Sequence, residues 1–114
     1  MRGFVCCAAR ENMPANSNFQ RRLDAGQLVV TGELAPPKGA SRATLERLAV
    51  AMRDHVDALN LTDNQRGIGR MSALGAGIVV QQLGIETIVQ MTCQHRNRIA
   101  LQADVLSGSV CGVN

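Results

Sequence analysis

Leu28-Val29-Val30-Thr31-Gly32-Glu33-Leu34-Ala35-Pro36-Pro37-Lys38-Gly39 is the stretch that decides the fold of this chain. Its apolar and β-branched residues predict a strand over 28–34, which the two prolines and the glycine cannot continue. Glu33 is a lone carboxylate at the end of this strand. Since ligands of α/β proteins bind at the carboxyl ends of strands, Glu33 is the first candidate for a catalytic residue. The structural alternative is a solvated loop residue or a partner in a helix cap.

Two more runs with strand character follow, over 56–61 and 87–91, so the three strands begin about 30 residues apart, as βαβ units require. A helix is predicted after each strand, over 41–53, 69–82 and 97–106, the last extending as far as Cys111 in its longest version. Such alternation predicts parallel strands with right-handed crossovers and hence an α/β fold. The spacing alone fits a (β/α)8 barrel and a doubly wound sheet equally well.

The segment before the first strand divides into two parts. Residues 1–16 show no sustained periodicity and are expected to form a disordered or frayed tail. Residues 17–25 are expected to form a short helix that Ser17 caps and Gly26 ends. In a closed barrel this helix would cover the end at which the first strand begins. Residues 17–114 are therefore assigned to one domain, and the hydrophobic content of 46% is enough for a packed core.

Composition disfavours several classes of protein. Aromatic residues make up 2% of the chain, with neither Trp nor Tyr, which disfavours a protein that stacks nucleic-acid bases. The net charge of +3 comes with scattered arginines, so it suits an anionic cofactor or substrate without predicting a nucleic-acid surface. No apolar run approaches the ~20 residues of a membrane helix, so no membrane partner is expected.

The four cysteines, at positions 6, 7, 93 and 111, indicate neither a metal site nor a disulfide framework. No Cys-x-x-Cys or paired histidine has the spacing of metal ligands, so no metal is expected. Irregularly spaced cysteines favour a reducing, cytoplasmic compartment. Cys93 has no neighbour that identifies it as a nucleophile and is interpreted as an ordinary small residue.

Polar residues gather where the predicted strands end. Parallel strands would place Glu33, the segment Thr62-Asp63-Asn64-Gln65, and Gln90 with Thr92 around one polar opening above an apolar core. Each group alone is common in loops, but polar groups at equivalent places in a repeat favour a binding site. The glycine-rich fingerprint of a Rossmann dinucleotide site is missing after the first strand, which disfavours that kind of cofactor site.

Basic residues near the same loops leave two interpretations open. They can form a solvated face, or they can anchor the pyrophosphate of a dinucleotide or a polyglutamate tail. The arginines concerned are Arg66, Arg70, Arg96 and Arg98. His95 is expected to cap a turn in preference to binding phosphate, and His55 lies at the opposite end of the strands, where residues more often serve stability.

Several segments, taken in order, resemble a known family. They are residues 29–39, residues 56–65, Arg70-Met71-Ser72, and residues 90–93 with 96–102. Together they resemble methylenetetrahydrofolate reductase over about residues 26–114. The resemblance implies a (β/α)8 TIM barrel that carries FAD at the carboxyl ends of its strands. It also implies hydride transfer from NAD(P)H to methylenetetrahydrofolate, giving methyltetrahydrofolate, with a homo-oligomer or an electron-donor protein as further partners.

The resemblance also implies roles for individual residues. Glu33 matches the catalytic glutamate, a general acid that helps to open the five-membered ring of the folate. Such a role needs a carboxyl group that is protonated near neutral pH, which burial against apolar groups favours. Thr62 matches a threonine that contacts the flavin, and Asp63 and Gln65 lie in the same cofactor-binding loop. Gln90 takes the place of a histidine that faces the flavin in many members.

The chain departs from the family pattern in two respects. The flavin-facing aspartate expected after a fourth strand would lie beyond Asn114, and Leu34-Ala35 stands where some branches have two phenylalanines. Since only three of about eight βα units are recognised, the chain as given is expected to be an N-terminal portion that is inactive by itself. Two other hypotheses stay open. One is a non-catalytic half-barrel that binds a ligand or partner and dimerises through its open edge; the other is a different barrel enzyme acting on a phosphorylated substrate.

Overall fold

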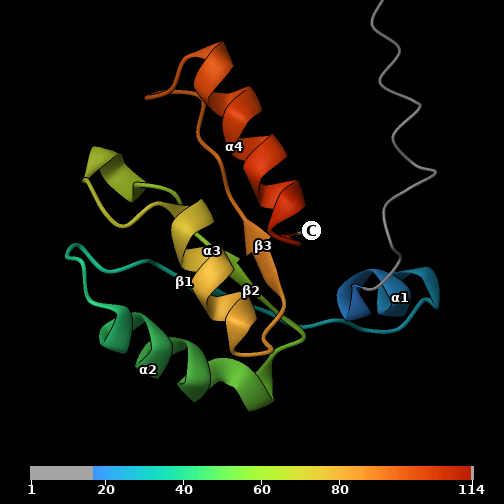
Figure 1. Ribbon diagram of the computed structural model, residues 1–114. Coiled ribbons are helices and arrows are strands. Elements are labelled where there is room, and N and C mark those ends of the chain that lie inside the picture. The colour runs from blue at the N-terminus through green and yellow to red at the C-terminus, as the bar shows by residue number, and fades with distance from the viewer. Residues whose placement is uncertain (1–16, 114) are drawn as a thin grey trace, which may run out of the picture.

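The computed structural model describes residues 17–113, which form a three-stranded sheet and four α-helices (Figure 1). The strands are β1 (Thr31–Leu34), β2 (Ala58–Leu61) and β3 (Thr87–Val89), and the helices are α1 (Asn18–Asp24), α2 (Arg42–Met52), α3 (Ala73–Gln82) and α4 (Arg98–Val110). Two 3₁₀ turns, η1 (Arg53–His55) and η2 (Gln65–Gly67), follow α2 and β2. The tail expected over 1–16 lies outside the described residues. Within residues 17–113, every helix is too short or too polar to span a lipid bilayer.

The three strands lie in the order β1-β2-β3 and run in the same direction. Residues 31–34 of β1 pair with residues 58–61 of β2, and residues 59–61 pair with residues 87–89 of β3. Strands and helices alternate from β1 to α4, so the prediction of three parallel βα units is confirmed. The described residues form an open sheet, which is consistent with part of a (β/α)8 barrel.

The strands are shorter than the apolar runs predict, because they begin at residues 31 and 58 in place of 28 and 56. Asp57 binds Val30 just before this point. Its amide donates to the Val30 carbonyl at 2.7 Å, and its carboxylate accepts from the Val30 amide at 2.8 Å. Since a side chain supplies one of these two bonds, the regular backbone ladder starts only afterwards. β3 ends at Val89 in place of 91, because β2 ends at its partner Leu61.

Each α-helix of the described region begins after a residue whose side chain caps it. The cap accepts a hydrogen bond from the backbone N–H three residues further along, which satisfies a donor that the first turn leaves free. The caps are Ser17, Ser41, Ser72 and Asn97, with N···O distances of 2.9–3.2 Å. The expected start of α3 at residue 69 is therefore wrong, and the helix begins at Ala73. α4 continues to Val110, close to its longest expected extent, and ends before Gly112, whose φ is +74°.

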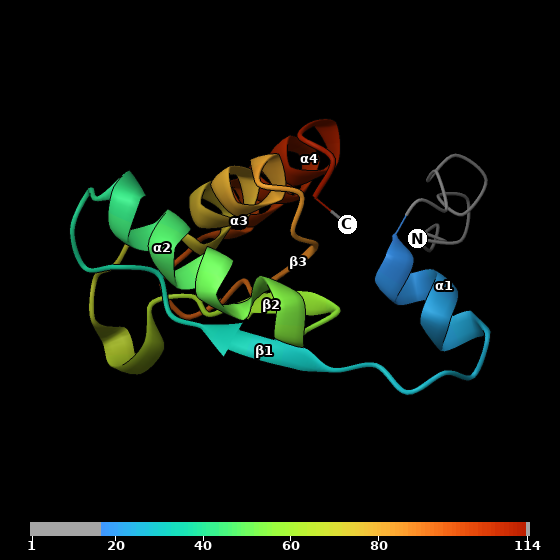
Figure 2. The same ribbon diagram turned by 90° about the horizontal axis from the view of Figure 1, so that it is seen from below.

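α2 and α3 pack on one face of the sheet, and α4 lies beside α3 (Figure 2). The core between these layers consists of Leu34, Leu45, Ala49, Leu59, Leu61, Ala73, Ala76, Val80 and Ile85. Gly77 lets α3 lie close to the sheet, because a Cβ at this position would be 2.7 Å from Cγ2 of Val89. The small residues of this helix predict such close packing. The opposite face of the sheet has no covering α-helix in residues 17–113, and strand alternation directs Glu33 and Asn60 toward that face.

α1 lies beyond the amino ends of the strands (Figure 2). Glu86, just before β3, accepts hydrogen bonds from the Phe19 amide at 3.1 Å and from the Ser17 hydroxyl. Asp57, just before β2, forms an ion pair with Arg22. The short helix is thus tied to the end of the sheet at which it is expected.

Candidate functional site

The carboxyl ends of β1, β2 and β3 form one edge of the sheet, which we call the rim together with the loops 62–67 and 90–96 that leave it. The register pairs Glu33 with Asn60 and Leu61 with Val89, so the two loops start next to each other. The polar segments singled out in the sequence therefore share one edge, as parallel strands predict.

Glu33 and Gln65 are in direct contact at the rim. Nε2 of Gln65 donates to Oε1 of Glu33 at 2.7 Å, which joins β1 to the loop after β2. The Glu33 side chain is exposed. Residues 17–113 thus do not supply the apolar surroundings that favour a protonated carboxyl group, and a bound ligand or another protein segment would have to provide them.

Two buried polar atoms near Glu33 have no hydrogen-bond partner among residues 17–113. One is Oδ1 of Asn60, the residue that lies opposite Glu33 in the register of β1 and β2. The other is Oγ1 of Thr62, a fully buried residue. An unpaired buried polar atom costs about 1–3 kcal/mol, so these two atoms are candidates for binding a group from outside the described residues. The sequence analysis does not include Asn60 in the predicted site, although a polar residue inside the apolar run of β2 could have indicated it.

The carboxylate of Asp63 is enclosed by protein donors, and its side chain has 0% exposed surface. Oδ2 accepts hydrogen bonds from the Thr92 amide at 3.0 Å and from Arg96. Oδ1 accepts from Nη2 of Arg96 at 3.2 Å and from Nδ2 of Asn64 at 3.0 Å. Burial by itself raises the pKa of Asp63, but the hydrogen bonds from Arg96 and Thr92 and the charge of Arg96 outweigh it and hold the pKa below its ordinary value. Direct contact between Asp63 and a cofactor would require one of these bonds to break.

Arg96 connects three segments of the chain. Its guanidinium group binds Asp63 through both Nη atoms, its Nε lies 3.2 Å from Oδ2 of Asp104 on α4, and its Nη1 lies 3.5 Å from the Thr92 carbonyl oxygen. The hydrogen bond to Asp63 raises the pKa of Arg96, so the side chain stays charged although it is only 17% exposed. From sequence, Arg96 is expected to be either solvated or an anion anchor. Its partner Asp63 lies 33 positions earlier and could not be recognised by local spacing.

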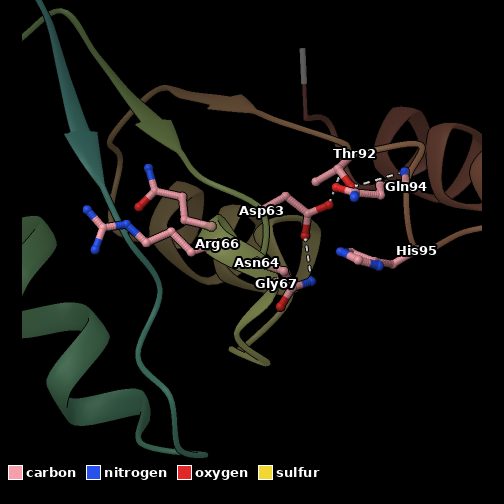
Figure 3. A pocket seen from close by; sticks show the side chains of 8 residues that line it. Asp63, Asn64, Arg66, Gly67, Thr92, Gln94 and His95 are labelled. Carbon is pink, nitrogen blue, oxygen red and sulfur yellow. Dashed lines mark hydrogen bonds between the residues drawn. The ribbon is translucent and has the colours of Figure 1, made fainter.

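A hollow of about 490 Å³ opens at the rim between the loops that follow β2 and β3 (Figure 3). Apart from Gly67, the residues that line it have polar or charged side chains; the lining consists of Asp63, Asn64, Gln65, Arg66, Gly67, Thr92, Gln94 and His95. Arg66 points away from His95, which lies on the far side of Asp63 (Figure 3). Asn64 and Arg66 have φ of +45° and +61°, a left-handed conformation that is uncommon outside glycine and often found at functional sites.

The other arginines near the rim differ in their contacts. Nη1 of Arg70 donates to the Pro36 carbonyl at 3.0 Å, and Arg98 donates to a glutamine one turn further along α4. Arg96 is held by carboxylates, as described above. Three of the four arginines considered as an anion anchor thus already bind protein groups. This weakens the interpretation of the set as a phosphate site.

Gln90 and Thr92 lie just beyond β3. The Gln90 amide donates to the Leu61 carbonyl at 3.1 Å, and its side chain is exposed. The Thr92 hydroxyl accepts from the Gln94 amide at 3.3 Å, while the Thr92 amide binds Asp63. Gln90 is therefore the more exposed of the two at the rim, whereas Thr92 holds the loop together.

A parallel sheet of βα units defines an α/β protein, and the carboxylate, amides and unpaired hydroxyl at its carboxyl edge make that edge the candidate ligand site. The family model described as methylenetetrahydrofolate reductase matches residues 18–114, and the chain belongs to this family. The resemblance read from the sequence is thereby confirmed. No curated protein and no solved structure matches the chain significantly. Membership associates the chain with an oxidoreductase family that is generally flavin-dependent and acts in folate-related reduction.

Proposed function

We propose that this chain carries part of the active site of a (β/α)8 enzyme that reduces 5,10-methylenetetrahydrofolate to 5-methyltetrahydrofolate with FAD and NAD(P)H. Family membership supports the reaction. The observation that carries the proposal is the 2.7 Å hydrogen bond from Gln65 to Glu33, which fixes a carboxyl group at the rim close to the unpaired polar atoms of Asn60 and Thr62.

The residues of the rim fit a flavin. A flavin ring presents carbonyl oxygens and ring nitrogens, and Oγ1 of Thr62 is a buried hydroxyl oxygen with no partner in residues 17–113. In this proposal Thr62, Gln65 and Gln90 hold FAD, and Asp63 supports them by fixing the loop that carries Thr62 and Gln65. Bound FAD would supply the hydride that it receives from NAD(P)H.

Glu33 is the proposed general acid. It would donate a proton to the folate ring nitrogen whose bond to the methylene carbon breaks, leaving the iminium carbon that accepts the hydride. Gln65 donates to Oε1 of Glu33, and Oε2 accepts no hydrogen bond among residues 17–113, so in this proposal Oε2 faces the substrate.

The test uses the protein encoded by the complete reading frame that contains this sequence. We expect it to purify with FAD and to form methyltetrahydrofolate with a nicotinamide donor. Glu33→Gln is expected to lower turnover by about 10²- to 10⁴-fold with FAD still bound, because it removes the proton donor. Glu46→Gln, at the ion pair with Arg42 on α2, is the control and should keep full activity. Protein without flavin, or full activity of Glu33→Gln, would contradict the proposal.

Residues 1–114 expressed alone are expected to retain no FAD. The described sheet pairs β2 on both sides but leaves β1 and β3 each with an unpaired edge, so the barrel is not closed in residues 17–113. The visible absorption spectrum of the purified chain checks this expectation, and stoichiometric flavin would refute it.

One observation favours the alternative function of a non-catalytic binding module. α4 exposes 69% of Ile99, 69% of Leu106 and 89% of Val110, which lie on one stripe of the helix at spacings of about two turns and one turn. Sedimentation of the purified protein separates the two functions. A well-defined dimer that binds no flavin favours the binding module, whereas bound flavin with turnover favours the reductase.

A further inference from the structure

We propose that Arg96 is a positioning residue of the rim, which holds the loop 62–67 and the loop 90–96 in a fixed relation so that Gln65 meets Glu33 and Thr62 stays at the rim. This assignment rests on the proposed function, because it concerns the same site. Arg96 does not touch Glu33. It acts through Asp63, which directly follows Thr62 and precedes Gln65 by two residues.

The geometry of the guanidinium group suits this task. A planar fork can bind both oxygens of one carboxylate, and Arg96 does so with Asp63 through Nη1 and Nη2. Its third nitrogen, Nε, remains free for Asp104 at 3.2 Å. One side chain thus fastens the loop after β2 to the loop after β3 and both of them to α4. A lysine has a single charged nitrogen and cannot reproduce these three contacts.

Burial makes the contact decisive for the position of the loop. The Asp63 side chain is fully buried and that of Arg96 is 17% exposed, so the pair is largely shielded from water. Without Arg96 the buried carboxylate would be unpaired, which is strongly unfavourable. The loop can relieve this cost by turning Asp63 toward solvent, and Asp63 would then give up the Thr92 amide and displace Thr62 and Gln65.

A substitution at Asp104 removes only one of the contacts of Arg96 and should therefore have a smaller effect than a substitution of Arg96 itself. Asp104 is 34% exposed and binds only Nε of Arg96, so Asp104→Asn leaves the fork on Asp63 intact. Arg42 on α2 provides the matched control, because it also binds one carboxylate through Nε but is 62% exposed and has no hydrogen bond or ion pair with the loops 62–67 and 90–96.

The experiment compares Arg96→Lys, Asp104→Asn and Arg42→Lys in the protein from the complete reading frame. Amide hydrogen exchange of the ligand-free protein is measured first, and FAD dissociation constants second. Arg96→Lys is expected to speed exchange in 62–67 and 90–95 by about tenfold or more while the core strands are unchanged, because local opening leaves the core folded. It is also expected to weaken FAD binding by about 10- to 100-fold, by analogy with residues that orient the ligands of a metal ion. Asp104→Asn should show both effects at smaller size, and Arg42→Lys neither.

Each outcome decides the proposal. If Arg96→Lys speeds exchange of loops and core alike and leaves the FAD affinity of the folded protein unchanged, Arg96 is only a stabilising residue and the proposal is overturned. If Arg96→Lys does not fold, Asp104→Asn decides in its place by the same two readouts. If the unaltered protein binds no FAD, the proposed function fails, and the exchange rates of the two loops still show whether Arg96 fixes the rim.

Discussion

The rim and the amino edge of the sheet are each held by an aspartate–arginine pair, and the two pairs differ in burial. At the rim, the side chains of Asp63 and Arg96 are 0% and 17% exposed. At the amino edge, those of Asp57 and Arg22 are 14% and 38% exposed. The rim pair joins two loops and a helix around the candidate site, whereas the amino pair fastens the peripheral helix α1. An aspartate–arginine pair thus holds the candidate site at one end of the sheet and fastens α1 at the other. Burial decides how much each pair contributes to the free energy of unfolding.

Backbone conformation separates the two ends as well. Within residues 17–113, the two non-glycine residues with positive φ, Asn64 and Arg66, both lie in the rim loop after β2. Strained backbone of this kind persists only where surrounding contacts enforce it. Asn64 is held by its hydrogen bond to Asp63 and by the Arg70 amide, which donates to its Oδ1 at 2.9 Å. The rim is thus a constrained region, which is what a preorganised site requires.

The largest expected effect is the loss of stability on removing the rim arginine. Arg96→Ala should lower the free energy of unfolding by about 3–5 kcal/mol, because it leaves a buried carboxylate without its partner. Arg22→Ala, at the more exposed pair, should cost about 0–1 kcal/mol. Urea denaturation of the two variants measures the difference.

A double variant sharpens this comparison. Replacing the whole rim pair, as Asp63→Leu with Arg96→Met, should recover most of the stability, because no buried charge is then left unpaired. Equal losses for Arg96→Ala and Arg22→Ala would show that burial does not distinguish the two ends.

Acid should weaken the rim. The pKa of Asp63 in the folded protein lies below its ordinary value of 3.8, so its carboxylate contributes stability that is fully present above that value and is lost as the pH falls through the lower folded-state pKa. The groups that face Asp63 are Arg96, His95, the Thr92 amide and the Asn64 side chain, and their charges and hydrogen bonds all favour the carboxylate. Unfolding measured from about pH 5 downward should show this loss in the unaltered protein, and Asp63→Asn should reduce it. An unchanged acid dependence in Asp63→Asn would assign it to other carboxylates.

A small and local effect is expected for the attachment of α1 at the amino edge. Glu86→Gln should weaken the attachment of α1 and cost about 1 kcal/mol, the usual size of a lost helix cap, because the Glu86 carboxylate accepts from the Phe19 amide at the start of that helix. α1 has no buried residues, so the effect should stay local. Hydrogen exchange should accelerate in 18–24 and remain unchanged in 62–67. Acceleration in both segments would show that the two ends of the sheet are coupled.

Local features of the fold could be predicted from sequence, and features that depend on distant partners could not. Ser41 and Asn97 act as caps because they bind the backbone three residues away, a relation that is visible in the sequence. The start of the regular ladder depends on Asp57, which meets Val30 27 positions earlier in the chain. The partner of Asp63 is also distant in the chain. The sequence therefore predicts that Asp63 binds a cofactor, whereas in the fold its carboxylate binds Arg96.

The sequence by itself determined the alternation of strands and helices, the parallel direction of the strands, the edge at which the polar residues gather, and the family. These follow from hydrophobic periodicity, helix caps and sequence motifs, all of which involve residues that are close together in the sequence. Only the tertiary structure decided that Gln65 binds Glu33, that Arg96 holds Asp63, and that Asn60 and Thr62 keep unpaired atoms. Side chains 32 and 33 positions apart meet only once the strands have paired, and burial then determines which charges are shielded from water.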